Sequence, residues 1–381
     1  MKANATRIPE LDGLRGVAIL LILIGHHFGA TIQAPPHSVF SMIVPGLALS
    51  WTGVDLFFVL SGFLIGGILL DHREAKNYYQ LFYLRRVCRI FPLYYLNLLL
   101  FAGLSGAGAE GISAWLFEHP LPWWSYVTFT QNILSVYWVA YVAYPAFYLG
   151  VTWSVAVEEQ FYMLIPLVIR RLPLRWLPYL LISLIILVIP LRLGIAHQYF
   201  VGTIANYILM PTRADGLLIG VLAAFLLRQE SFTRFIKAHH YYLHTIMALV
   251  AGSLIGLNFF HLPAVLSTGY FMSTYGYTLV DFCFAGLLIS VLTNQNGWIN
   301  RRLRSRWLQQ LGLISYGLYL IHLPVLGLAH GIAFRQTPRI ANGTELVVTL
   351  IALIISMLIA AVSWEILEQP ILKWGRSFYY Q

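Results

Sequence analysis

Hydrophobic residues gather along this chain into long stretches that few charges interrupt. A helix needs about 20 predominantly apolar residues to cross the roughly 30 Å of hydrocarbon in a bilayer. Ten stretches approach or reach that length, and they lie at 14–33, 52–70, 92–104, 151–169, 177–196, 208–227, 241–260, 273–294, 311–333 and 345–367. The stretch at 92–104 is the least secure, because it is short before it ends in SGAGAEG. The pattern predicts an all-α integral membrane protein with about ten transmembrane helices.

Composition agrees with a membrane location. The 381 residues are 59% hydrophobic and only 10% charged, which is less than half the charged fraction of about 25% in soluble domains. Lysine and arginine exceed aspartate and glutamate by 24 to 15, which gives a net charge of +9. Such an excess can indicate binding to nucleic acid, to anionic lipid or to an anionic substrate, and the positions of the basic residues decide among these.

The basic residues follow the membrane topology. If the N-terminus is cytoplasmic, all Lys and Arg fall in inner segments except four near outer ends, namely Arg192, Arg213, Arg335 and Arg339. This bias predicts that both termini are cytoplasmic. It also indicates that the basic residues follow membrane topology and do not form a nucleic-acid-binding surface. A cleaved signal peptide is the alternative for the N-terminus, but its removal would place the arginine clusters outside.

The first stretch, LDGLRGVAILLILIGHHFG, carries ionisable groups that lipid penalises. Arg15 and His26 are eleven positions apart, almost three helical turns, so both project from one face about 16 Å apart. Asp12 can pair with Arg15, which can also act as a snorkelling anchor. Ionisable groups inside membrane segments tend to mark function, and an imidazole is a natural general base near neutral pH. His26 is therefore the first catalytic candidate.

The second stretch adds a further charge at Asp55. This carboxylate is either the partner of a basic group elsewhere in the bundle or an acid that orients and polarises His26. Ser61 in the same stretch is better explained by close helix packing than as a nucleophile, because no G-x-S-x-G surrounds it.

Arginines cluster in the loop that follows, in YLRRVCRIFPLYY. Arg85, Arg86 and Arg89 form i,i+3 and i,i+4 pairs on a predicted short helix that Pro92 follows. The cluster is a topology anchor at the inner face, or it binds a phosphorylated ligand, because guanidinium groups match phosphate geometry.

Two later stretches carry further candidates. The fourth span opens WSVAVEEQFYMLIP, and one helical face there holds Glu158, Phe161 and Tyr162, with Trp153 above them. Two adjacent carboxylates, here Glu158 and Glu159, are unfavourable inside a span unless they are paired or in contact with water. The sixth span opens PTRADGLLIG, where Arg213 and Asp215 predict either an ion pair or a polar contact with a ligand.

The segment 105–150 is expected outside the cytoplasm as a re-entrant or interfacial loop of a single domain, 1–381. It is rich in aromatic side chains, namely Trp115, Trp123, Trp124, Tyr137, Trp138 and Tyr141. These could stack on sugar rings, but an interfacial aromatic belt is the favoured interpretation. Cys88 and Cys283 form no disulfide pattern, and the scattered histidines form no metal motif. We expect no metal and no permanently bound cofactor.

Five segments together resemble the acyltransferase-3 family of bacterial integral-membrane acyltransferases. The segments are RIPELDGLRGVAILLILIGHHF, GVDLFFVLSGFLI, YLRRVCRIFPLYY, WSVAVEEQFY and RADGLLIGVL, and they occur in the family's order over essentially the whole chain. The resemblance implies ten spans with both termini inside, and transfer of an acyl group, commonly acetyl from acetyl-CoA, to a hydroxyl. It also implies that Arg15 and His26 form the family's arginine–histidine pattern with His26 as essential base.

The resemblance implies further roles. Arg86 and Arg89 match the arginine pair implicated in holding the donor, and Glu158, Phe161 and Tyr162 match a glutamate followed by an aromatic pair. Many relatives continue into an extracytoplasmic esterase-like domain. Because this chain stops at Gln381, we expect it to act alone or with a separate extracytoplasmic partner.

The resulting hypothesis is a bacterial inner-membrane O-acyltransferase. Acetyl-CoA docks at Arg86, Arg89 and Arg85, His26 takes the proton of an acceptor hydroxyl, and Asp55 or Glu158 fixes the imidazole tautomer. The acceptor is a cell-envelope glycan or lipid-linked sugar. A macrolide-like small molecule is the alternative acceptor, an acyl-histidine is the alternative chemistry, and a secondary transporter is the alternative class, although no internal repeat supports it.

Overall fold

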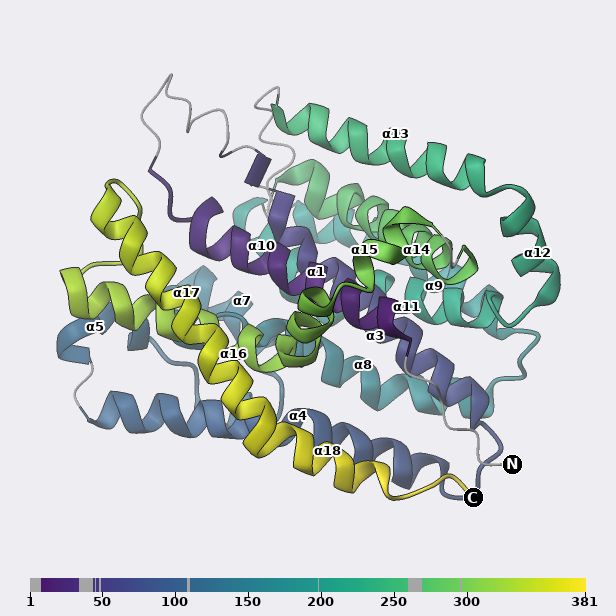
Figure 1. The fold of residues 1–381 in the computed structure, drawn as a ribbon, viewed down its shortest axis with the longest axis horizontal. Coiled ribbons are helices and arrows are strands. Elements are labelled where there is room, and N and C mark those ends of the chain that lie inside the picture. Colours follow the sequence, from purple (N-terminus) through teal and green to yellow (C-terminus); the bar gives the residue numbers. More distant parts are fainter. Residues whose placement is uncertain are drawn as a thin grey trace.

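The computed structural model describes residues 8–33, 49–107, 110–197, 199–259, 269–294 and 297–381, together with 44, 46 and 47. Helices dominate this part of the chain (Figure 1). Its only β contact is an isolated bridge between Ile32 and Ile340. The prediction of an all-α protein is confirmed.

A helix occupies each of the ten predicted positions. These helices are α1 (Pro9–Ile24) with η1 (Gly25–Gly29), α3 (Gly53–Asp71), α4 (Tyr78–Gly106), α8 (Thr152–Arg171), α9 (Leu177–Ala196), α11 (Met210–Leu226), α13 (His240–Phe259), α14 (Tyr277–Thr293), α16 (Arg306–Phe334) and α17 (Gly343–Ser363). Eight segments in the described ranges are long and apolar enough to cross a membrane, and α8 and α13 are not among them. The protein is therefore a multi-pass membrane protein, and the exact number of crossings stays a prediction.

Shorter elements join these helices. They are η2 (Leu49–Thr52), α5 (Glu110–Phe117), α6 (Trp123–Val127), α7 (Gln131–Tyr141), η3 (Phe147–Leu149), α10 (Tyr199–Ile208), α12 (Glu230–Ala238), η5 (Met272–Gly276), α15 (Trp298–Leu303), η6 (Trp364–Glu368) and α18 (Gln369–Arg376). Four of them, α5, α6, α7 and η3, lie within the segment 105–150, so this segment folds as a set of short helices.

One expectation about α4 is wrong. Pro92 does not end a short arginine-bearing helix but lies inside a single helix of 29 residues. Proline removes one backbone hydrogen bond, and membrane helices tolerate this where neighbouring helices satisfy the freed groups. Near the proline, the hydroxyl of Tyr316 on α16 donates a hydrogen bond of 2.9 Å to the carbonyl of Ile90, although the carbonyl that Pro92 itself frees is that of Cys88. The arginines and the apolar stretch 92–104 therefore belong to one continuous helix.

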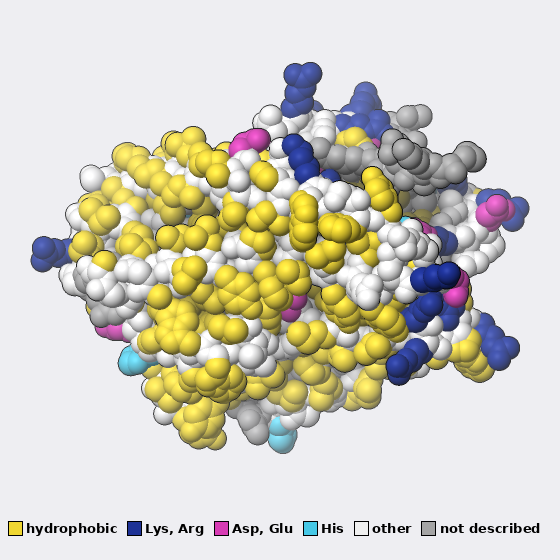
Figure 2. All heavy atoms as spheres, turned by 90° about the horizontal axis from the view of Figure 1, so that it is seen from below, with side chains coloured by type: hydrophobic (Ala, Val, Ile, Leu, Met, Phe, Trp, Pro, Cys, Tyr) yellow, Lys and Arg dark blue, Asp and Glu magenta, His cyan; other side chains and the backbone are white. Residues whose placement is uncertain are grey.

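The two ends of the molecule differ in character. The C-terminus lies at one end, where α18 runs along α4, and α5 lies at the opposite end (Figure 1). Hydrophobic side chains cover most of the face shown in Figure 2, and most of its Lys and Arg side chains lie toward the end that holds the C-terminus. This distribution is the one expected when that end faces the cytoplasm.

Helices α1 and α16 pack closely because glycine lines their contact. A Cβ atom on Gly16 would collide with the carbonyl oxygen of Leu308, and one on Gly312 would collide with the carbonyl oxygen of Asp12. Small residues at such contacts let helix backbones approach each other in membrane proteins. The contact also fixes the relative position of the two helices, and ten residues beyond Gly16 and Gly312 it brings together His26 and His322.

The α1–α16 contact predicts the effect of a single methyl group. Gly312→Ala should lower stability by about 1–3 kcal/mol, because the backbones must separate to admit it. The matched control is Gly252→Ala on α13, where a Cβ atom meets nothing within 4 Å. Thermal unfolding of the two purified variants in detergent measures the difference, and equal midpoints would contradict the close contact.

Candidate active site

The first span changes its winding where its histidines occur. Helix α1 passes into the π-helical turn η1, Gly25–Gly29, which contains both His26 and His27. Such turns are rare and frequently lie at functional sites. Residue 25 packs against Ser50, whose hydroxyl would lie 2.6 Å from a Cβ atom there. The Nδ1 atom of His27 lies 3.2 Å from the carbonyl oxygen of Leu23, so His27 contacts its own helix.

His26 contacts a second imidazole that lies far away in the sequence. Its Nδ1 atom is 2.8 Å from Nε2 of His322 on α16, and the two ring planes differ by 25°, with centroids 5.0 Å apart. His322 is completely buried, whereas His26 is half-buried.

The surroundings of His322 define the protonation pattern of the pair. Its Nδ1 atom lies 2.7 Å from the carbonyl oxygen of Tyr319 and 3.1 Å from that of Leu318. Carbonyl oxygens only accept, so Nδ1 carries the proton of a neutral His322 and Nε2 is an acceptor. His26 must then donate through Nδ1–H, which leaves its own Nε2 with a free lone pair. That nitrogen can take a proton from a substrate or attack a carbonyl carbon.

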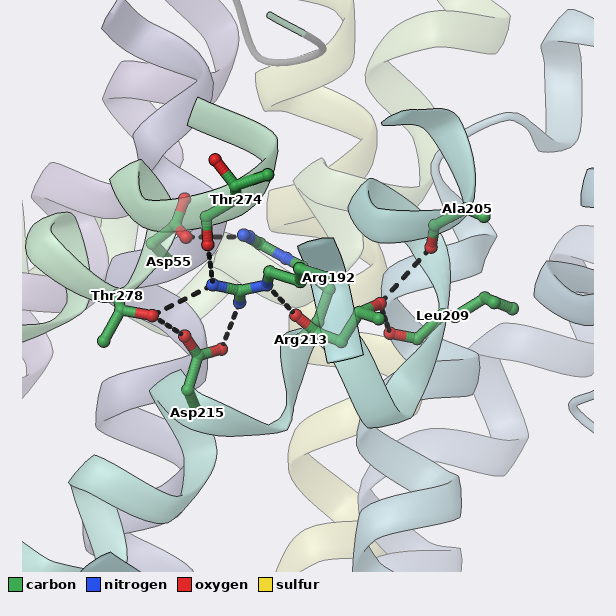
Figure 3. Close-up of polar contacts among 9 residues, drawn as sticks. Asp55, Arg192, Ala205, Leu209, Arg213, Asp215, Thr274 and Thr278 are labelled. Atoms are coloured by element: carbon green, nitrogen blue, oxygen red, sulfur yellow. Dashed lines mark hydrogen bonds and ion pairs between the residues drawn. The ribbon is translucent and has the colours of Figure 1, made fainter. Parts of the chain in front are cut away.

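Asp55 does not orient His26, which corrects one of the two alternatives for this residue. Its Oδ1 atom lies 2.7 Å from Nη2 of Arg213 on α11, and both side chains are fully buried (Figure 3). The guanidinium of Arg213 also lies over the ring of Tyr277, 4.2 Å from its centroid. Asp55 is thus the partner of a basic group, as the other alternative expected.

Arg213 and Asp215 do not pair with each other. Asp215 instead accepts from Nη2 of Arg192 on α9 at 2.7 Å and from the hydroxyl of Thr278 on α14 at 2.6 Å. Arg192 donates further to the carbonyl of Thr212 at 2.7 Å. The two buried ion pairs connect α3, α9 and α11, and the hydrogen bond from Thr278 adds α14 (Figure 3). Residues two positions apart on a helix point in different directions, so each finds a partner on another helix.

Within the described residues Glu158 pairs with a hydroxyl group and not with His26. Its Oε1 atom accepts from the hydroxyl of Ser61 on α3 at 2.7 Å. Phe161 is buried in the core and is 4% exposed. Trp153 lies apart from them, packed on Phe58 and on Tyr207, with ring centroids 6.2 Å and 4.8 Å away. The predicted face of α8 therefore divides between two regions.

Three arginines from two helices form a cationic cluster. Arg15 interacts electrostatically with Arg86 and Arg89. Arg86 lies over the ring of Tyr162, 6.0 Å from its centroid. Arg89 lies 5.6 Å from the centroid of Tyr316. In addition, Nη1 of Arg89 is 3.7 Å from Oε2 of Glu368 and Nη1 of Arg15 is 3.4 Å from Oδ1 of Asp12. Arg15 also lies about 16 Å from His26 along α1, from the rise per residue.

Arg85 lies outside this cluster. Its Nη2 atom donates to the carbonyl of Phe378 at 2.7 Å, and its guanidinium lies 5.1 Å from the ring centroid of Tyr380. The sequence could not separate Arg85 from Arg86, because the C-terminal segment that contacts Arg85 is almost 300 residues away in the chain. We therefore assign Arg85 to the contact with that segment.

His322 is the site residue that the sequence analysis missed. It lies within ISYGLYLIHLPV, an apolar run, and the rule that singled out His26 as an intramembrane ionisable group applies equally to it. No motif marks His322 as the partner of His26. Among the described residues no group of three or more His, Cys, Asp or Glu side chains is arranged to hold a metal ion.

The fold and the site define a multi-pass helical membrane protein with a histidine pair inside its bundle and a cationic cluster toward one end. The chain belongs to the acyltransferase-3 family, whose profile, described as an acyltransferase domain, matches residues 8–365. The resemblance inferred from five segments is confirmed.

Curated relatives carry the family assignment further. The O-acetyltransferase OatA of Staphylococcus aureus is 27% identical over 97% of this chain and 58% of its own length. The peptidoglycan O-acetyltransferase OatA of Listeria monocytogenes is 26% identical over 98% of this chain and 57% of its own. The putative peptidoglycan O-acetyltransferase YrhL of Bacillus subtilis is 28% identical over 97% of this chain and 56% of its own length. The chain thus spans less than two thirds of these relatives, and no solved structure matches it.

The buried ion pairs predict a contrast between two aspartates of α3. Asp55→Ala leaves Arg213 charged and buried, so it should lower stability by about 3–5 kcal/mol. The control is Asp71→Ala, because Asp71 at the end of α3 pairs with Arg228, just after α11, at 2.6 Å but is 55% exposed. Losing that pair should cost about 0–1 kcal/mol. Thermal unfolding in detergent ranks the variants, and equal losses would refute the buried role of Asp55.

Proposed function

We propose that this chain is a membrane O-acyltransferase that moves an acetyl group from cytoplasmic acetyl-CoA to a hydroxyl of a cell-envelope glycan. The free Nε2 atom of His26 carries this proposal, because a member of an acyltransferase family presents there an unprotonated nitrogen whose tautomer its neighbours define. The names of the relatives support acetyl as the acyl group and peptidoglycan as the glycan class. Their bacterial sources support the cytoplasmic membrane as the location.

In the proposed reaction, Nε2 of His26 takes the proton of the acceptor hydroxyl while the oxygen attacks the thioester carbonyl. The C–S bond then breaks, and the CoA thiolate takes the proton back from the imidazolium. The products are the acetyl ester and free CoA, with His26 restored. His322 is a positioning residue in this scheme, because its Nε2 holds the ring of His26 and accepts from Nδ1–H throughout.

The donor enters from the end of the molecule that holds the C-terminus. Arg15, Arg86 and Arg89 supply three guanidinium groups for the nucleotide phosphates of acetyl-CoA. The thin pantetheine arm then has to extend along α1 toward His26, a separation of about 16 Å from Arg15. Ser61 and Glu158 are polar groups among the spans on this inner half of the bundle.

Alternatives to this scheme give different observations. An acetyl group carried on His26 itself would appear as a mass increment on the intact protein after incubation with acetyl-CoA alone. A small-molecule acceptor would be acetylated while the glycans of the cell remained unchanged. Family membership favours acyl transfer over transport, and a separate extracytoplasmic partner would be required only if the purified chain releases CoA but leaves glycans unmodified.

The histidine pair predicts a graded set of activities. His26→Ala should lower the rate of acetyl transfer by about 10²- to 10⁴-fold, because the proton acceptor is lost. His322→Leu should lower kcat with little change in the KM for acetyl-CoA, and His322→Gln should restore part of kcat, because its amide oxygen can accept from Nδ1–H. CoA release by purified protein in detergent is the measurement, with His239→Ala, just after α12, as control. Full turnover by His26→Ala would remove the proposed base.

The cationic cluster predicts a difference between neighbouring arginines. Arg86→Ala and Arg89→Ala should each raise the KM for acetyl-CoA by about 10- to 150-fold, because each loses a charged contact to phosphate worth about 1.5–3 kcal/mol. Arg85→Ala is the matched control on the same helix and should leave that KM nearly unchanged, because Arg85 contacts the C-terminal segment. Initial-rate kinetics at varied acetyl-CoA distinguish them. The assignment fails if Arg85→Ala has the larger effect.

A further inference from the structure

A cavity opens at the end of the molecule opposite the cationic cluster. Its volume is about 620 Å³, within the range of roughly 300–1,000 Å³ that is typical of small-molecule sites. The segment from α5 to the start of α8 forms most of its wall, and α10 supplies the rest. It therefore lies where the segment 105–150 covers the bundle.

The cavity contains a buried acceptor without a partner. Gln131, which is 2% exposed, lines the cavity and donates through Nε2 to the carbonyl of Thr152 at 2.9 Å and to the hydroxyl of Tyr94 at 3.1 Å. Because a carbonyl can only accept, these contacts define which atom of the amide is nitrogen. Its Oε1 atom is buried, and no hydrogen bond satisfies it within the described part of the chain.

A buried donor lies in the same wall. The indole Nε1 of Trp115 also has no hydrogen-bond partner among the residues that the structure describes. An unsatisfied buried polar group costs about 1–3 kcal/mol. One unpaired donor and one unpaired acceptor lie on two side chains that line the same cavity, so they call for a ligand with both kinds of group. Hydroxyl groups have this property, because each can donate and accept.

Aromatic rings also contribute to the wall, which is otherwise formed mostly by small and aliphatic residues. Tyr126, Tyr144, Trp153 and Tyr207 line the cavity together with Trp115. Flat apolar rings beside a few hydrogen-bonding groups match the two faces of a pyranose, whose C–H groups pack on aromatic rings while its hydroxyls need polar partners. By contrast, Trp124 and Tyr137 of the same segment are 57% and 54% exposed and do not line the cavity. Such exposure is what an interfacial aromatic belt would require of these two side chains.

We propose that this cavity is the subsite that binds the saccharide acceptor, with Gln131 and Trp115 as its hydrogen-bonding groups. The acceptor role rests on the proposed acyl transfer. The cavity is joined to the histidine pair by a short series of contacts. Next to Trp153 in sequence, Ser154 lies 2.7 Å from the hydroxyl of Tyr319. The ring of Tyr319 lies 6.0 Å from that of His322.

Binding of a soluble peptidoglycan fragment tests the subsite independently of catalysis. The probe is the disaccharide of N-acetylglucosamine and N-acetylmuramic acid, titrated calorimetrically into the full chain in detergent. Trp115→Phe keeps the aromatic wall but removes the donor, and Gln131→Met removes the acceptor. Each should weaken binding about two- to tenfold, the range for one lost hydrogen bond. Trp124→Phe, in the same segment, is the control and should bind like the unaltered chain.

Kinetics separate this inference from the proposed function. Trp115→Phe should raise the KM for the disaccharide and leave the KM for acetyl-CoA unchanged. Thermal unfolding checks that Gln131→Met still folds, and Trp115→Phe decides the outcome if it does not. The subsite is refuted if the unaltered chain shows no binding at millimolar disaccharide, or if Trp115→Phe binds as well as Trp124→Phe. The chain could also bind the disaccharide, with weaker binding in Trp115→Phe, and yet transfer no acetyl group. That result would uphold the saccharide site and refute the acyltransferase function.

Discussion

Charges inside this bundle must find their partners within the protein, because hydrocarbon offers none. Asp55 meets Arg213 at 2.7 Å and Asp215 meets Arg192 at 2.7 Å, all four side chains being buried. These pairs connect α3, α9 and α11, and the hydrogen bond from the hydroxyl of Thr278 to Asp215 adds α14. Helix α3 is in turn held against α1, where a Cβ atom on Gly53 would lie 2.5 Å from the carbonyl oxygen of Ala18. The helix that carries His26 thus packs on a support whose position is set by electrostatics.

This use of carboxylates explains why the imidazole of His26 is supported by another imidazole. A carboxylate beside His26 would need its own compensating charge in a low-dielectric interior. His322 is neutral in the assigned tautomer, and backbone carbonyls satisfy its Nδ1–H. A neutral acceptor can hold the tautomer of His26 without placing another charge in the bundle. Of the two candidate acids, Asp55 pairs with Arg213 and Glu158 accepts from the hydroxyl of Ser61.

The sequence predicted those features that depend on local composition and not those that depend on distant partners. Long apolar runs placed a helix at each expected position, because a membrane helix must be apolar over its length. The partner of Asp55 was not predictable, because residue 213 has no local relation to residue 55. The same holds for His322 and for the contact of Arg85 with the C-terminal segment. The continuity of α4 through Pro92 was also not predicted, because a proline removes one helical hydrogen bond and so favours a helix end in a sequence pattern, whereas α4 continues past it.

The arrangement of the groups has a consequence for the direction of transfer. The cationic cluster lies with the C-terminal end of the molecule, whereas the aromatic cavity lies with the segment 105–150 at the opposite end. The histidine pair lies between them, since Arg15 precedes His26 by about 16 Å along α1. Under the proposed function, donor and acceptor would therefore approach one base from opposite sides of the membrane. Only the acyl group would need to pass from the cytoplasmic side of the membrane to the outer side. Neither the nucleotide nor the glycan would have to pass through the bundle.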